Sequence, residues 1–481
     1  MANLFKVKPS TTKSHQANQL VGKTMCVEIN SLEHTGIGVV SDHQPVIFVE
    51  GALPGEKVEI VIREQKARFC RAELKKVIQA SPARTTPFCQ HFNQCGGCQT
   101  QHVSADSVCS MKQTSIEQLI LHTPLIHSIG QTGQRKKGSL STRGIKKSVH
   151  RTIGDLVGQL HWSPTLYAEP TGYRRKTRLS VDARNRQDIK LGFRQSGSKQ
   201  IFSIQQCQVL TPALQHLIEP LQNVMATLDN PSAIGHVSMF EGSKGIQVCL
   251  RVTKSLNQQD KDKWAEFSRM NQIQLAYEDN HHQITLADLT DQPLVFDVPN
   301  DIELAVNIND FVQVNDSVNR QMIEQACNWL SLDSEDNVLD LFCGIGNFSL
   351  PMASQCKTVV GVEGVAEMVQ RATQNALKNN ISNCQFWQAD LNNAKAISKD
   401  ELLTFNKVLL DPARDGAGEA VDLIVQGKPS HILYVSCNPA TFARDTAKLL
   451  AHKYQISKIG LMDMFPQTAH TELMALFVPK Q

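Results

Sequence analysis

The chain has 481 residues, of which 41% are hydrophobic and 20% are charged, so it is long enough for roughly three domains with buried cores. No apolar run approaches the ~18 residues of a membrane-spanning helix, and the N-terminal residues lack the apolar segment and cleavage site of a secretion signal. These patterns predict a cytosolic protein without membrane association. The 13 cysteines are therefore expected to be reduced rather than paired in disulfides.

The net charge of +3 hides a strong asymmetry along the chain. Residues 1–210 contain 29 Lys and Arg against 14 Asp and Glu, a net charge of +15, whereas residues 211–481 contain 20 against 32, a net charge of −12. Such a division predicts a polyanion-binding N-terminal half attached to a catalytic domain. The alternative is a basic surface that is merely solvated.

Residues 20–80 alternate apolar and polar side chains between turn signals, which is the pattern of a small all-β barrel. The clearest strands are predicted at 39–40, 46–49 and 58–62, with turns at Gly36, Gly38, Gly51 and Pro54-Gly55. The segments His34–Val39 and Glu50–Glu56 resemble a TRAM domain, an OB-like module that binds RNA. The resemblance implies an RNA-binding barrel over residues 15–80.

Three cysteines lie within ten residues, in the pattern Cys89-x5-Cys95-Gly-Gly-Cys98. The glycines let the backbone wrap closely, and thiolates suit both Zn²⁺ and an iron–sulfur cluster. The spacing alone leaves the two metals about equally open. Cys109 is the nearest further thiol in the sequence, although its surroundings are predicted to be helical.

Residues 126–153 form a basic segment with no acidic residue amid Gly, Ser and Thr. This composition is typical of a disordered loop. Contacts with RNA phosphates and a neutral insertion are both open interpretations.

Residues 160–300 combine strand-like stretches, such as Gln247–Val252, with helices predicted at 211–228 and 258–271. Together these elements indicate a central α/β domain. Within it, Gly172–Arg178 places basic side chains on both faces of a strand, which favours a contribution to an RNA cleft.

A strand, turn and helix pattern follows at Asn337–Phe348, where a short apolar strand runs into the turn Gly344-Ile-Gly346. A second strand ends at Glu363, 23 residues beyond Asp340, about where a nucleotide-binding α/β unit places its ribose-binding carboxylate. The third position of a dinucleotide fingerprint is Ser349 instead of glycine. The turn therefore favours S-adenosylmethionine over a pyrophosphate cofactor.

The next strands are predicted to end in polar residues at the same edge of this sheet. Asn383–Asp390 and Phe405–Asp411 end in acids, and His431–Ser436 is followed by Cys437, with a helix N-cap predicted at Asn438-Pro439. A thiol that faces a helix N-terminus can be stabilised as a thiolate nucleophile. A lone cysteine is more often an inert buried residue, but the neighbouring strand ends favour a catalytic one.

Four motifs resemble the RNA uracil-5-methyltransferases: Asp340–Phe348, Asp411–Arg414, Ser436–Pro439 and His470–Glu472. With the N-terminal features, they resemble most the bacterial branch that methylates 23S rRNA. The resemblance implies Cys437 as the nucleophile that adds to uracil C6 and Glu472 as the base that removes the C5 proton. It implies S-adenosylmethionine contacts from Gln313, Phe342, Asn347, Glu363, Asp390 and Asp411, and a 4Fe-4S cluster bound by Cys89, Cys95, Cys98 and Cys207.

The expected architecture is therefore a multidomain α/β protein with an OB-like TRAM β-barrel and a Rossmann-like methyltransferase domain. The expected ranges are 15–80 for the barrel, 81–300 for the cysteine cluster and central domain, and 301–481 for the methyltransferase domain. The cluster is expected to be structural, the partner to be 23S rRNA, and the protein to be a monomer.

Three alternative functions stay open. The protein could methylate another rRNA or tRNA uridine, act as a DNA cytosine-5-methyltransferase, or be a non-catalytic RNA-binding or assembly protein. In the DNA enzymes the nucleophile follows a proline, whereas Cys437 precedes Asn-Pro. The presence of both Cys437 and Glu472 argues against a non-catalytic protein.

Overall fold

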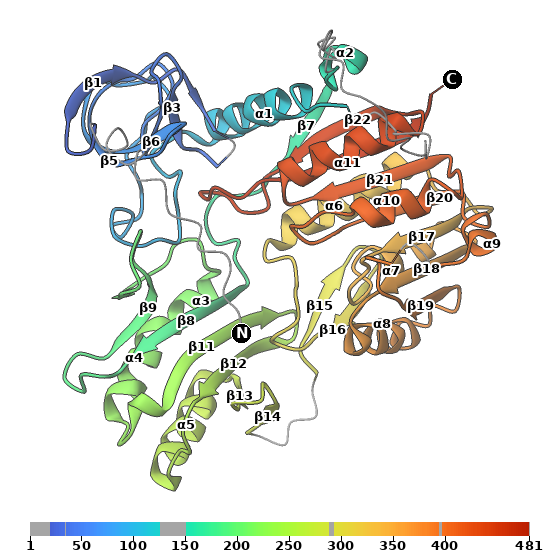
Figure 1. Cartoon of the computed structure of the whole chain (residues 1–481). Helices are drawn as coiled ribbons and strands as arrows, with labels where there is room; N and C mark the ends of the chain where they lie inside the picture. Colours follow the sequence, from blue (N-terminus) through green and yellow to red (C-terminus); the bar gives the residue numbers. More distant parts are fainter. Residues whose placement is uncertain (1–19, 34, 126–150, 288–292, 394–396, 481) are drawn as a thin grey trace, which may run out of the picture. The chain divides into compact units, whose positions relative to one another are not determined.

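The computed structural model describes residues 20–33, 35–125, 151–287, 293–393 and 397–480, and Figure 1 shows its elements. The basic insertion predicted at 126–153 falls outside the described residues, apart from Arg151–Ile153. The chain divides into two compact units, which are described separately. The first contains the residues up to Phe88, Cys98–Ser115 and Gln467–Ala469, and the second contains Cys89–Gly97, Ile116–Pro466 and His470–Gln481.

The first unit contains a six-stranded sheet in the order β1-β5-β6-β4-β3-β2. Its strands are β1 (Thr24–Glu28), β2 (Ser31–Leu32), β3 (Gly38–Val40), β4 (Val46–Glu50), β5 (Lys57–Gln65) and β6 (Phe69–Gln79). Along β5, Val58, Ile60 and Ile62 are fully buried, which is the two-residue period of a strand with one apolar face. The strands predicted at 39–40, 46–49 and 58–62 are confirmed.

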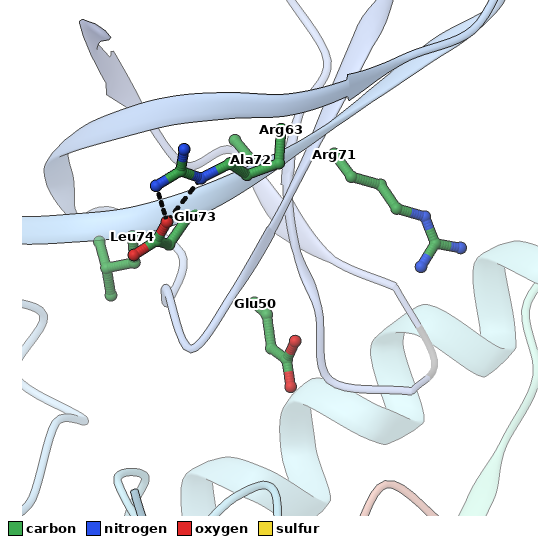
Figure 2. Close-up of a pocket in the computed structure, with 6 residues that line it drawn as sticks. All are labelled: Glu50, Arg63, Arg71, Ala72, Glu73 and Leu74. Atoms are coloured by element: carbon green, nitrogen blue, oxygen red, sulfur yellow. Dashed lines mark hydrogen bonds and ion pairs between the residues drawn. The ribbon is translucent and has the colours of Figure 1, made fainter. Parts of the chain in front are cut away.

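A pocket on this sheet is lined by Glu50, Arg63, Arg71, Ala72, Glu73 and Leu74 (Figure 2). The Nε of Arg63 donates a hydrogen bond to Glu73 at 2.6 Å, and the Nζ of Lys75 donates another at 2.6 Å. Exposed ion pairs of this kind contribute little to stability. Arg63 and Lys75 on this sheet are therefore both paired with Glu73. The pocket contains none of the site residues predicted above.

The second unit begins with a seven-stranded sheet in the order β10-β9-β8-β11-β12-β13-β14. Its strands are β8 (Lys176–Asp182), β9 (Lys190–Arg194), β10 (Ile201–Ser203), β11 (Ile234–Gly242), β12 (Gly245–Val252), β13 (Gln274–Glu278) and β14 (Ile284–Leu286). The accompanying helices are α3 (Pro212–His216), α4 (Ile218–Thr227), η1 (Pro231–Ala233) and α5 (Gln258–Asn271). The helices predicted at 211–228 and 258–271 are confirmed, although a break at Leu217 divides the first of them.

The same unit contains an eight-stranded sheet in the order β19-β18-β17-β20-β21-β23-β22-β7. Its strands are β7 (Trp162–Leu166), β17 (Asn337–Leu341), β18 (Thr358–Glu363), β19 (Cys384–Gln388), β20 (Lys407–Leu410), β21 (His431–Ser436), β22 (Tyr454–Met462) and β23 (Glu472–Pro479). The five strands from β19 to β21 in this order are parallel, whereas β23 is antiparallel to both β21 and β22. The parallel part is the Rossmann-like arrangement predicted from the sequence.

The remaining elements are α1 (Ala105–Leu121), α2 (Gly154–Val157), β15 (Val295–Val298), β16 (Ile302–Ala305), α6 (Asp316–Leu330), α7 (Ser349–Ala353), α8 (Ala366–Lys378), α9 (Lys399–Leu402), α10 (Gly418–Ile424) and α11 (Pro439–Ala451). None of the helices in the described part of the chain is long and apolar enough to cross a membrane.

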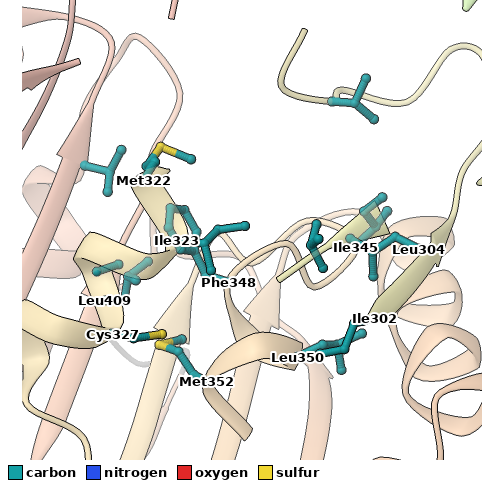
Figure 3. Close-up of a cluster of buried hydrophobic side chains, with 14 of the residues drawn as sticks. Ile302, Leu304, Met322, Ile323, Cys327, Ile345, Phe348, Leu350, Met352 and Leu409 are labelled. Carbon is teal, nitrogen blue, oxygen red and sulfur yellow. The ribbon is translucent and has the colours of Figure 1, made fainter. Parts of the chain in front are cut away.

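A buried apolar cluster joins α6, β16 and the segment that follows β17 (Figure 3). It includes Leu304, Met322 and Ile323 together with Ile345 and Phe348. The last two residues stand on either side of Gly346-Asn347 in the chain. The glycine turn after β17 is therefore anchored in the core by Ile345, its middle residue, and by Phe348, which follows it.

Candidate active site

Polar residues gather at the edge where the parallel strands of the eight-stranded sheet end. Strand β18 ends at Glu363, β20 is followed by Asp411 and β21 by Cys437. Strand β23 runs the opposite way, and its Leu473 pairs with Ser436 at the end of β21. Because of this reversal, the first residue of β23, Glu472, lies at the same edge as Cys437.

The turn after β17 needs backbone conformations that favour glycine. Gly344 and Gly346 have φ angles of 56° and 97°, and a Cβ on Gly346 would lie 3.1 Å from the side chain of Leu350. Phe342 has a φ of 65°, which is unusual for a bulky residue. The N–H of Gly344 donates a hydrogen bond to the Glu363 carboxylate at 3.2 Å, so the turn and the predicted ribose-binding acid are in contact.

Two helices fix this turn through buried asparagines. Asn347 exchanges two side-chain hydrogen bonds with Asn319 of α6, at 3.0 and 3.1 Å. Asn375 of α8 donates a hydrogen bond to the carbonyl of Ile345 at 3.2 Å. Both Asn319 and Asn375 are fully buried. The sequence alone does not single them out, because one asparagine in a helix carries no signal of its tertiary partner.

Asp340 on β17 is a fully buried carboxyl group whose second oxygen lacks a partner. The hydroxyl of Ser349 donates a hydrogen bond to its Oδ2 at 2.5 Å, whereas its buried Oδ1 accepts none. Burial, with added repulsion from Asp411 and Glu363, raises the pKa of Asp340 to about 7. Such a site suits a ligand that donates hydrogen bonds or carries positive charge, and the ribose, amino and sulfonium groups of S-adenosylmethionine meet this requirement.

Cys437, Glu472 and Asp411 form one electrostatically coupled group. Burial, followed by repulsion from Glu472 and Asp411, raises the pKa of the Cys437 thiol to about 11. Burial, followed by repulsion from Asp411, raises the pKa of Glu472 to about 8, and burial raises that of Asp411 to about 7. In the ligand-free protein, desolvation and the two carboxyl groups therefore oppose the thiolate that the helix N-terminus is expected to stabilise.

Arg414 supplies the opposing positive charge and lowers the pKa values of both Cys437 and Glu472. Its backbone carbonyl accepts a hydrogen bond from Asn438 Nδ2 at 2.8 Å. Its Nη2 lies 3.4 Å from Nδ1 of His470. Asn438 also accepts a hydrogen bond from the N–H of Ala440 and caps α11, which confirms the N-cap predicted at Asn438-Pro439.

Two of the predicted cofactor residues have surroundings that differ from those at the sheet edge. Gln313 is buried in an irregular segment before α6, although the pattern of Phe311–Asn315 alone predicts a strand. The segment pairs only at the isolated bridge between Asn315 and Arg174, so no extended ladder forms. Asp390 is exposed, and its Oδ1 accepts hydrogen bonds from the backbone and side chain of Asn392.

The four predicted cluster ligands are divided between the two units: Cys98 belongs to the first, and Cys89, Cys95 and Cys207 belong to the second. Cys89 lies close enough to raise the pKa of Cys95, after the larger effect of burial, and the N–H of Gly97 donates a hydrogen bond to the Cys95 sulfur at 3.4 Å. No group of three or more His, Cys, Asp or Glu side chains in the described ranges has the arrangement of a metal site. All 13 cysteines are described, and none forms a disulfide.

Comparison with known proteins adds to these observations. A family model described as tRNA (Uracil-5-)-methyltransferase matches residues 164–480, and a TRAM domain model matches residues 18–75. The chain is 38% identical over 480 residues, 99% of each chain, to 23S rRNA (uracil(1939)-C(5))-methyltransferase RlmD of Shewanella sediminis. It is 38% identical over 483 residues to the protein of that name from Psychromonas ingrahamii, covering 99% of this chain and 100% of the other.

Among solved structures, the chain resembles Pyrococcus abyssi tRNA (uracil-54, C5)-methyltransferase in complex with S-adenosyl-L-homocysteine. The TM-score is 0.68 at 21% identity, and the match covers 94% of this chain and 99% of the other. At this identity the likeness is one of fold. With the family match over residues 164–480 and full-length relatives at 38% identity, the chain belongs to the RNA uracil-5-methyltransferase family, whose members are S-adenosylmethionine-dependent enzymes.

Proposed function

We propose that this enzyme methylates C5 of one uridine in 23S rRNA, the uridine that corresponds to uracil 1939 in the names of its relatives. The observation that carries the proposal is the coupled group of Cys437, Glu472 and Asp411 at the sheet edge that also contains the glycine turn. Full-length similarity to enzymes named for 23S rRNA supports the substrate, and the TRAM domain supports RNA as its class.

In the proposed reaction, Cys437 loses its proton to solvent and its sulfur adds to uracil C6, which makes C5 of the resulting enolate a nucleophile. Bound S-adenosylmethionine would supply the electrophilic methyl group and leave as S-adenosylhomocysteine. Glu472 then removes the C5 proton, after which the C6–sulfur bond breaks and Cys437 is released. A carboxylate with a pKa of about 8 is a stronger base than an ordinary glutamate, which suits this role.

The proposed cofactor residues are Gln313, Phe342, Asn347, Glu363, Asp390 and Asp411. The contact between the glycine turn and Glu363 supports the ribose position. The orphaned Oδ1 of Asp340 and the raised pKa values of Asp340 and Asp411 support a ligand with positive charge nearby. Asp390 rests on the resemblance alone.

A structural 4Fe-4S cluster bound by Cys89, Cys95, Cys98 and Cys207 is also proposed. The closeness of Cys89 to Cys95 and the N–H to sulfur hydrogen bond from Gly97 support it. The N–H of Gln205 also donates to the His91 ring at 3.4 Å, which joins the segment before Cys207 to the segment of Cys89. The steps of the proposed reaction use Cys437, Glu472 and the methyl donor, and none of them is assigned to the cluster.

Metal content tests the cluster. Protein purified without oxygen should contain roughly four irons per chain, and Cys207→Ser should lose them while Cys109→Ser on α1 keeps them. Zinc in place of iron, or equal loss in both variants, would contradict the proposed ligand set.

The function is tested by transfer of labelled methyl groups to a 23S rRNA fragment, with tRNA and single-stranded DNA of similar length as controls. Wild-type protein should form 5-methyluridine at one position of the rRNA. Cys437→Ala should abolish transfer while leaving S-adenosylmethionine affinity nearly unchanged, because the thiol acts on the base. Preferential methylation of tRNA or DNA would overturn the substrate, and substantial turnover by Cys437→Ala would overturn the nucleophile.

A further inference from the structure

Arg175 lies in the basic segment Gly172–Arg178, but its side chain is only 8% exposed. Its Nε donates a hydrogen bond to the carbonyl of Gln313 at 3.0 Å, and its backbone N–H donates one to the carbonyl of Val314 at 3.0 Å. Its Nη1 donates a third to Asp316 Oδ1 at 2.8 Å. One residue thus holds the irregular segment that leads into α6 at three points.

The geometry of these contacts depends on a guanidinium group. Its carbon lies over the Phe296 ring, 4.4 Å from the centroid. Asp316 receives a further hydrogen bond from Arg320 at 2.9 Å, so the carboxylate is held by two arginines. A lysine at position 175 would have the charge but could not donate in two fixed directions as the guanidinium does.

Three buried polar atoms of this segment and of the Arg175 side chain that contacts it have no hydrogen-bond partner: Oε1 of Gln313, Nδ2 of Asn315 and Nη2 of Arg175. The orientation of the Asn315 amide is fixed, because its Oδ1 accepts a hydrogen bond from the N–H of Val318 and caps α6. Its Nδ2 is therefore the unsatisfied side. Buried polar groups are almost always paired, so this concentration of unpaired atoms marks a place where a polar ligand binds.

We propose that Arg175 is a positioning residue of the cofactor site, which holds Gln313–Asp316 so that the side-chain amides of Gln313 and Asn315 contact S-adenosylmethionine. This inference rests on the proposed function, which assigns Gln313 to the cofactor. Asn315 becomes a further cofactor residue, since the cofactor has hydrogen-bond acceptors in its adenine, ribose and carboxylate groups. Arg175 is correspondingly removed from the cations predicted to bind RNA in Gly172–Arg178.

The test measures S-adenosylmethionine affinity by calorimetry, and rRNA affinity at several salt concentrations, with full-length protein. Arg175→Gln and Arg175→Lys should each weaken cofactor binding at least tenfold and leave the salt dependence of RNA binding unchanged. The matched control is Arg178→Gln, three residues later at an exposed position of β8, which should bind the cofactor like wild type.

Asn315→Asp distinguishes a loss of cofactor contact from misfolding of the protein. It keeps the oxygen that caps α6 and replaces only the unpaired Nδ2 with an oxygen, so the melting temperature should be retained while cofactor affinity falls at least tenfold. A double-mutant cycle of Arg175→Lys with Gln313→Ala should be non-additive for cofactor binding, because Arg175 acts through Gln313.

Different failures have different meanings. If wild-type protein does not bind S-adenosylmethionine, the proposed function fails. If wild type binds but Arg175→Lys and Asn315→Asp both bind within twofold of it, the positioning inference is overturned. A salt slope whose magnitude falls by about 0.7 in Arg175→Gln, which removes the charge, would instead identify Arg175 as a contact to a single-stranded phosphate.

Discussion

Strands β17 and β20 have buried charged residues at both ends, but these residues form an ion pair only at the amino ends. At the amino ends, Asp336, just before β17, and Lys407, the first residue of β20, form an ion pair at 2.9 Å with side chains 4% and 7% exposed. Lys407 also donates hydrogen bonds to the carbonyls of Leu330 and Ser331, each at 2.6 Å. Although burial opposes it, hydrogen bonds from Lys407, Asp333 and Asn406 hold the pKa of Asp336 below its ordinary value.

Near the carboxyl ends, Asp340 and Asp411 have no such cation. Burial raises the pKa of each to about 7, and that of Glu472 beside them to about 8. A group with a raised folded-state pKa favours folding only while it is protonated. The paired charges at the amino ends of these two strands therefore stabilise the fold. The unpaired carboxylates at the carboxyl ends destabilise it until a ligand neutralises their charge.

The largest effect at the carboxyl edge is expected from Glu472→Gln. Loss of the base should lower turnover by about 10²–10⁴-fold, while Cys437 addition and methyl transfer still proceed. A methylated protein–RNA adduct should then persist on a denaturing gel. The variant Glu419→Gln, at an exposed acid in α10 outside the coupled group, should turn over normally without adduct. Normal turnover by Glu472→Gln would show that another group is the base.

At the amino edge, Lys407→Met should cost about 3–5 kcal/mol of unfolding free energy, because it leaves Asp336 buried without its cation. Urea unfolding at neutral pH measures this loss. Adding Asp336→Asn should recover part of it, since the uncompensated charge is removed. Lys448→Met, which breaks the more exposed pair with Asp422, should cost no more than about 1 kcal/mol. Equal losses in the two lysine variants would contradict the comparison.

Removing charge at the carboxyl edge should have the opposite sign. Asp340 has a raised pKa, so its contribution to folding is present below pH 4 and is lost as the pH rises through about 7. Asp340→Asn should therefore stabilise the ligand-free protein by about 2 kcal/mol at pH 8 and by much less at pH 5. Thermal unfolding at the two pH values would measure this difference, and a larger gain at pH 5 would contradict it.

The sequence predicted the parts of this site that depend on local pattern. Strand ends at Glu363, Asp411 and Cys437, the glycine turn and the cap at Asn438 could be located because each has a periodicity or a turn signal. Parallel strands then bring their ends to one edge without further information. Strand β23 runs the opposite way, so its first residue, Glu472, also lies at this edge. Only the family resemblance had singled out that residue.

The missed features depend on contacts between segments distant in the chain. Asn319 and Asn375 become meaningful only when α6 and α8 pack beside the glycine turn. Arg175 carries the composition of an RNA-binding segment, but its burial against Gln313 and Phe296 gives it a different environment. The expected Cys437 thiolate rested on the cap, which is local in the sequence, whereas the desolvation and the two carboxyl groups that raise the pKa of Cys437 come from tertiary contacts.

The smallest expected effect is a shift in the Cys437 pKa when the cofactor binds. S-adenosylmethionine would bring a positive sulfonium to the edge where burial, together with Glu472 and Asp411, raises this pKa to about 11. S-adenosylhomocysteine has nearly the same shape and a neutral sulfur. The cation should lower the pKa of Cys437 by at least about one unit, equivalent to ~1.4 kcal/mol, and the neutral analogue by clearly less.

Alkylation of Cys437 by iodoacetamide, followed by mass spectrometry across a pH series, measures the midpoint of the thiol titration with each ligand. Simple shielding of the thiol would slow alkylation at every pH without moving the midpoint, so equal midpoints with the two ligands would show that the sulfonium does not act on this thiol.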